Sequence, residues 1–146
     1  MKRYLFEIIV VIFCFIILFG FNSSSKSEYL GDISEIKLIY VNPYITTFSS
    51  VKCNEFNNVF SKVLKEKIFT EKDEIQRIQS LINSAEAKND TLKSLDTRFK
   101  IYFYNQQSEV TSVICGNLFG VNINENYYFL DEKDSVYLRE LLDVEK

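Results

Sequence analysis

Cys53 and Cys115 are the residues with the clearest capacity for covalent chemistry in this chain of 146 residues. The third cysteine, Cys14, lies in an apolar run near the N-terminus. In an exported domain, two cysteines most simply form one disulfide. The loop that it closes would stabilise the fold by about 4 kcal/mol in the chain-entropy model. The alternative is a thiol nucleophile at Cys115, which would need a carboxylate or lysine as its base because the chain has no histidine.

The absence of histidine also removes the commonest metal ligand and the usual general base near neutral pH. An acidic cluster at Asp131, Glu132 and Asp134 lacks the spacing of a calcium-binding loop, and the start of a helix accounts for all three carboxylates. The sequence contains no Gly-rich phosphate loop, no Gly-x-Ser-x-Gly elbow and no Cys-x-x-Cys pair. We therefore expect no catalytic residue, no metal and no cofactor.

Arg98, Tyr102 and Tyr104 are the second group of interest, because alternate residues of an extended strand lie on one face. A guanidinium can bind a carboxylate or phosphate through two hydrogen bonds. Tyrosines on a partly exposed sheet suit a protein or glycan surface. These three residues form the candidate binding face. The alternatives are that Arg98 pairs with a local acid, Asp96 or Glu109, and that helices cover the tyrosines.

The segment that must position these residues runs from 96 to 116. Phe99, Ile101 and Phe103 alternate with charged and tyrosine residues, and a polar break at 105–108 separates them from a second alternating run. Period-two apolar spacing on both sides of a short polar turn predicts a β-hairpin. We place this hairpin at the centre of a sheet because no other part of the chain alternates so cleanly.

Further strands are predicted before and after this hairpin. Residues 36–41 form a strand that ends at an Asn-Pro turn, and residues 45–53 are predicted to be the strand returning from it. Residues 59–69 fit both a helix face and a strand face, and we favour a loop followed by a strand over 63–69. A second hairpin is predicted with its turn at residues 124–126.

Two amphipathic helices complete the predicted domain. Thr70 is the expected N-cap of the first, which has acidic residues in its first turn and about 15 residues in all. Its apolar residues recur at spacings of three and four. Asp131 or Asp134 caps the second. The predicted class is α+β, an antiparallel sheet of about five to seven strands with two helices packed on one face.

The N-terminus predicts export. Lys2 and Arg3 precede an apolar run, and residues 1–21 are expected to be a signal peptide or an N-terminal membrane anchor. Residues 22–32 are a Ser-rich polar linker. Residues 33–146 form a single extracytoplasmic domain, either anchored in the membrane or secreted after cleavage. The net charge of -3 gives no basic surface for nucleic acid. The expected partners are the membrane, through the N-terminal segment, and a protein of the envelope.

The chain resembles small exported or membrane-anchored proteins of bacterial envelopes that have no assigned activity. The resemblance rests on the apolar N-terminus, the Ser-rich linker and three segments at 68–75, 96–102 and 114–120 (IFTEKDEI, DTRFKIY and ICGNLFG). It transfers no functional residue to this chain.

We therefore expect a non-enzymatic binding or interaction module of the envelope, one form of which is an inhibitor-type protein. The alternative is a small extracytoplasmic hydrolase that uses carboxylates or Cys115. A structural envelope component without a specific ligand is the third hypothesis.

Overall fold

Strand β1 (Ile33–Tyr40) is an inner strand of the sheet and is paired along both edges. The computed structural model of the chain describes residues 32–87 and 95–144. In it, β1 runs antiparallel to β2 (Lys65–Phe69) on one side and to β4 (Phe99–Asn105) on the other. β1 therefore has no free edge that could accept a further strand.

The sheet has seven strands in the order β2-β1-β4-β5-β6-β7-β3, and every neighbouring pair is antiparallel. Its other strands are β5 (Val110–Asn117), β6 (Gly120–Ile123), β7 (Asn126–Phe129) and the short β3 (Glu86–Ala87). The predicted hairpin at 96–116 is confirmed as β4 and β5, the third and fourth strands across the sheet. Both predicted hairpins are present.

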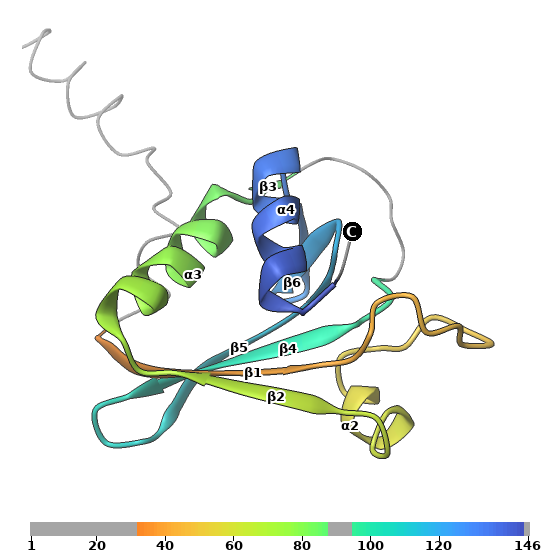
Figure 1. The fold of residues 1–146 in the computed structure, drawn as a ribbon, viewed down its shortest axis with the longest axis horizontal. Coiled ribbons are helices and arrows are strands. Elements are labelled where there is room, and N and C mark those ends of the chain that lie inside the picture. The colour runs from red at the N-terminus through yellow and green to blue at the C-terminus, as the bar shows by residue number, and fades with distance from the viewer. Residues whose placement is uncertain (1–31, 88–94, 145–146) are drawn as a thin grey trace, which may run out of the picture.

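Helices α3 (Lys72–Ser84) and α4 (Glu132–Leu141) lie on the same side of the sheet, as Figure 1 shows. Each presents an apolar stripe to the sheet, and the stripes join the inward residues of the strands in one buried cluster. Its fully buried members include Ile36, Leu38, Ile78, Leu81, Phe99, Ile101, Phe103, Ile114 and Leu138. The α+β class and the open antiparallel sheet are thus confirmed.

The opposite side of the sheet is covered only in part. Residues 41–64, which include the one-turn helix α2 (Phe56–Val59), fold beneath one end of the strands (Figure 1). There Val41, Val51, Phe56 and Phe60 form a second, smaller buried cluster. Apolar burial on both faces fixes this end of the sheet.

Two local predictions are wrong. Residues 45–53 form no strand, because both edges of β1 are already occupied. Thr70 is not the N-cap of α3; the cap position is Glu71, whose backbone is extended and whose side chain makes no capping hydrogen bond. The N-cap of α4 is Asp131, one of the two predicted residues, and its Oδ1 accepts a hydrogen bond from the backbone N–H of Asp134 at 2.7 Å.

The predicted N-terminal segment 1–21 and all of the predicted linker except Asp32 lie outside the described residues. Among the residues that the structure describes, no helix has the length and apolar character needed to cross a membrane.

Helix α4 is fastened to the sheet at its C-terminal end by Asp143. The N–H groups of Asp143 and Val144 donate to the carbonyls of Glu140 and Arg139, the paired pattern that closes a helix with a left-handed residue. Asp143 is that residue, with φ 52°, at a position where glycine is the usual choice. Its carboxylate explains the exception, because it accepts hydrogen bonds from Lys67 at 2.6 Å and Tyr40 at 2.5 Å.

The hydrogen bonds at Asp143 lower the pKa of the acceptor and raise that of the tyrosine donor. The hydrogen bonds from Lys67 and Tyr40 hold the pKa of Asp143 below its ordinary value. Burial and the bond to Asp143 raise the pKa of Tyr40 to about 12. Ionised Asp143 therefore stabilises the fold above the ordinary carboxylate pKa of about 4, and this contribution is lost as the pH falls through the lower folded-state pKa. The contribution of Tyr40 is complete below about pH 10 and is lost as the pH rises towards 12.

Replacing Asp143 with asparagine tests this fastening. Asparagine tolerates the left-handed backbone but carries no charge. Because the carboxylate is half exposed, we expect Asp143→Asn to lower the free energy of unfolding by only about 0.5–1 kcal/mol at pH 7. The loss should shrink below pH 4 in urea titrations. Glu140→Gln, which removes an exposed carboxylate from α4, is the control and should change little. A loss that is the same at pH 3 and pH 7 would contradict the assignment.

Candidate functional site

The structure contains the predicted disulfide. Cys53 and Cys115 are bonded, with their Cα atoms 5.7 Å apart, and the bond ties the segment beneath the sheet to β5. Cys115 is buried. In this form neither cysteine offers a free thiol, which the nucleophile hypothesis for Cys115 requires.

Tyr102, one of the two tyrosines of the predicted binding face, lies on the part of the sheet that no described helix or loop covers. Strand register places Ile68, Lys37, Tyr102 and Val113 side by side across β2, β1, β4 and β5. All four face away from α3 and α4, because the residues before and after each of them belong to the helix-facing core or its edge. Ile68 is 55% exposed and Val113 39% exposed. We call this row, together with Tyr104 in the next row, the open sheet face.

Tyr104 lies opposite Glu35 on one side and Val110 on the other. Both tyrosines of the open sheet face are half buried, so part of each side chain stays accessible. Charged groups lie around them. Lys37 pairs with Glu66 at 2.7 Å, and Lys100 Nζ lies 5.4 Å from the centre of the Tyr102 ring.

Arg98 belongs to a different environment, although it shares the strand face of the tyrosines. Its side chain is only 8% exposed, and its guanidinium lies 5.3 Å from the ring centre of Phe60, which is in the segment beneath the sheet. Nη2 donates to Asp96 Oδ2 at 2.5 Å and to Thr47 Oγ1 at 3.2 Å. Arg98 therefore pairs with a local acid, Asp96, as one of the two alternatives for this residue predicted. The structure divides the predicted face into an open tyrosine surface and a buried arginine.

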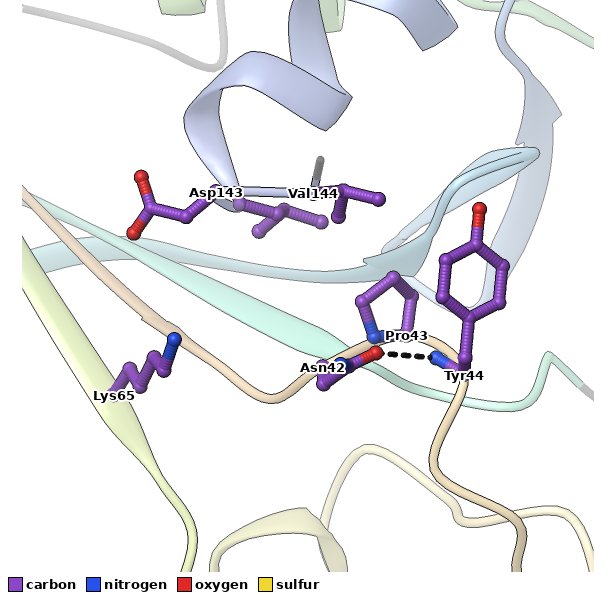
Figure 2. A pocket seen from close by; sticks show the side chains of 7 residues that line it. Asn42, Pro43, Tyr44, Lys65, Asp143 and Val144 are labelled. Carbon is purple, nitrogen blue, oxygen red and sulfur yellow. Dashed lines mark hydrogen bonds between the residues drawn. The ribbon is translucent and has the colours of Figure 1, made fainter. Parts of the chain in front are cut away.

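A first cleft, of about 240 Å³, lies where β1 turns towards the segment beneath the sheet. Figure 2 shows Lys65 and Asp143 on one side of it and Pro43 and Tyr44 on the other. The backbone N–H of Tyr44 donates to Asn42 Oδ1 at 2.9 Å and shapes this turn. The Asp143 carboxylate is already used by Lys67 and Tyr40, and Lys65 Nζ lies 6.0 Å from the centre of the Tyr40 ring. The charged groups that line this cleft therefore offer a ligand little binding capacity.

A second cleft, of about 290 Å³, borders the same turn. It is lined by Pro43, Tyr44, Asp96, Arg98, Asn117, Leu118, Phe119 and Arg139. Arg139 Nη1 donates to the Tyr44 hydroxyl at 2.8 Å, across 95 positions of sequence. No local sequence pattern points to Arg139, because only the packing of α4 over the sheet brings it to this place.

The acidic cluster of α4 serves the helix. Asp131 is the N-cap, Glu132 and Asp134 lie in the first turn, and Asp134 accepts a hydrogen bond from Ser84. Within residues 32–87 and 95–144, no three histidine, cysteine or carboxylate residues are placed to hold a metal ion. These carboxylates act on the helix dipole and the cap.

No protein-family model, curated protein or solved structure matches this chain.

Proposed function

We propose that this protein is a non-enzymatic interaction module that binds a protein partner through the open sheet face. The observation that supports the proposal most is the row formed by Ile68, Lys37, Tyr102 and Val113. In it, Tyr102 lies between Lys37 and the exposed Val113, and the exposed Ile68 lies beyond Lys37. Tyrosine is enriched at protein interfaces and among the residues that dominate binding energy. A half-buried ring also loses little conformational freedom on binding.

The charges around the row favour a specific partner over general adhesion. Lys37, Glu66 and Lys100 give both signs of charge within one surface, and a partner must complement all of them. An inhibitor-type protein that covers another protein's active site is one form of this function.

We further propose that the module works outside the cytoplasm, in the cell envelope, anchored by its N-terminal segment or secreted. The support is the apolar run that follows Lys2 and Arg3, together with the Cys53–Cys115 disulfide. Disulfides persist mainly in oxidising compartments. This location would bring the open sheet face to envelope proteins.

Affinity measurements on two tyrosine variants test the interface. The tagged full chain is used to isolate its partner from the envelope, and the dissociation constant is then measured for Tyr102→Ala and Tyr137→Ala. Tyr137 is the control, since it is also half buried but lies on α4, on the other side of the sheet. We expect Tyr102→Ala to weaken binding at least about tenfold and Tyr137→Ala less than about twofold. Equal effects of the two variants would contradict the proposal, as would isolation of the native protein without any partner.

A further inference from the structure

The second cleft brings together two arginines from different layers of the fold. Arg98 comes from the segment just before β4 and lies beneath the sheet end, whereas Arg139 comes from the last turn of α4. Both line the cleft beside the turn between β5 and β6. Two guanidinium groups repel each other unless an anion lies between them or nearby.

Arg139 retains donors for a ligand. A guanidinium has five N–H donors, and the bond from Nη1 to the Tyr44 hydroxyl is the one side-chain hydrogen bond that Arg139 makes within the described part of the chain. No carboxylate of the described residues lies within 4 Å of it to form an ion pair. Arg139 and the 64% exposed Tyr44 therefore present a charged group and a hydroxyl at the mouth of the cleft.

Arg98 adds a buried donor that lacks an acceptor. Its Nη1 is inaccessible and has no hydrogen-bond partner among the described residues. Leaving such a group unpaired is unfavourable, because burial removes its hydrogen bonds to water and no acceptor replaces them. Nη2 donates to Asp96 and Thr47, so Nη1 is the guanidinium nitrogen that lacks an acceptor among the described residues.

Asp96 does not neutralise both arginines. Its Oδ2 binds Arg98 and its Oδ1 accepts the backbone N–H of Val51 at 2.9 Å, which fixes the carboxylate away from Arg139. Two arginines and one aspartate leave the lining with a net charge of +1. The exposed ring of Phe119, with Pro43 and Leu118, adds apolar surface beside this charge.

We infer that this cleft binds a small ligand that carries a carboxylate or a phosphate beside an apolar or aromatic group. The anionic oxygens accept from Arg139 and the Tyr44 hydroxyl, and the positive charge of Arg98, which also lines the cleft, adds to the attraction. The apolar part of the ligand packs against Phe119 and Pro43. This site is separate from the open sheet face and does not depend on it.

An NMR titration of the ¹⁵N-labelled full chain in a non-ionic detergent tests the site. The probes are sodium benzoate, an aromatic carboxylate, and inorganic phosphate. We expect saturable shifts of the Tyr44 and Phe119 amides, with a dissociation constant of about 1 mM or tighter for at least one probe. Arg139→Gln should weaken binding by at least about tenfold, because a charge-assisted hydrogen bond is lost. Tyr44→Phe should weaken it less.

Arg77→Gln is the matched control, since it removes an arginine from α3, where the guanidinium stacks on Tyr137 outside the cleft. It should change the dissociation constant less than about twofold. Saturation by benzoate alone would identify carboxylates as the ligand class, and saturation by phosphate would extend the class to phosphates; both support the site. Shifts that do not saturate with either probe would overturn it. Equal weakening by Arg139→Gln and Arg77→Gln would also overturn it, because this would reveal a general charge effect.

Discussion

Removing the Cys53–Cys115 disulfide is expected to lower the free energy of unfolding by about 2–5 kcal/mol. The bond joins residues 62 positions apart and so restricts a long loop of the unfolded chain. It also holds the segment beneath the sheet, whose cluster of four buried apolar residues is small.

The measurement is urea denaturation of the double variant Cys53→Ala/Cys115→Ala beside the oxidised native chain. Alanine is preferred to serine because Cys115 is buried and a hydroxyl there would lack a partner. Hydrogen exchange should accelerate most at the amides of α2, which lies in the segment that the disulfide holds. Cys14→Ala, which removes a cysteine outside the bond, is the control. A loss of less than about 1 kcal/mol would show that packing alone holds the segment.

Asp96→Asn is expected to destabilise the fold by about 2–3 kcal/mol, because it leaves the Arg98 charge buried without a counterion. Breaking a buried ion pair from one side costs about 3–5 kcal/mol, and the 36% exposure of the Asp96 side chain reduces that penalty. Asparagine keeps an oxygen that can accept the backbone N–H of Val51. The change in the free energy of unfolding therefore measures the loss of the Asp96 charge and not the loss of this loop contact.

The double variant Asp96→Asn/Arg98→Met is the internal control for this expectation. Removing the guanidinium also removes the unpaired charge, and the methionine chain fills part of the space against Phe60. We expect the double variant to be more stable than Asp96→Asn alone in the same urea titration. If the single variant loses less than about 1 kcal/mol, or the double variant is the less stable, the buried-charge explanation is wrong.

The parts of the fold with strong local patterns could be predicted from sequence. The hairpin of β4 and β5 has alternating apolar residues on both strands, and α3 has a single apolar stripe. The strand predicted at 45–53 failed for a non-local reason, since its Thr, Ser and Val content suits a strand but β1 pairs with β2 and β4 instead. The amino-acid composition of a segment does not predict which edges of a sheet are free to pair with it.

In the candidate sites too, features that depend on local sequence could be predicted, and features that depend on the packing of distant segments could not. The pairing of Cys53 with Cys115 followed from cysteine count and expected location, and the pairing of Arg98 with Asp96 was one of the stated alternatives. The contact between Arg139 and Tyr44 could not be predicted, because it depends on how α4 crosses the end of the sheet. Likewise, the separation of Arg98 from Tyr102 depends on where residues 41–64 fold.

The measurement that tests the central proposal most directly is site-specific photo-crosslinking of the full chain in the cells that express it. A photoreactive residue is placed at Val113, on the open sheet face, or at Val136, an equally apolar and 46% exposed position on α4. The proposal predicts one dominant protein adduct from position 113 and none from position 136. No adduct from position 113, or the same adducts from both positions, would contradict an interaction module that binds through this face.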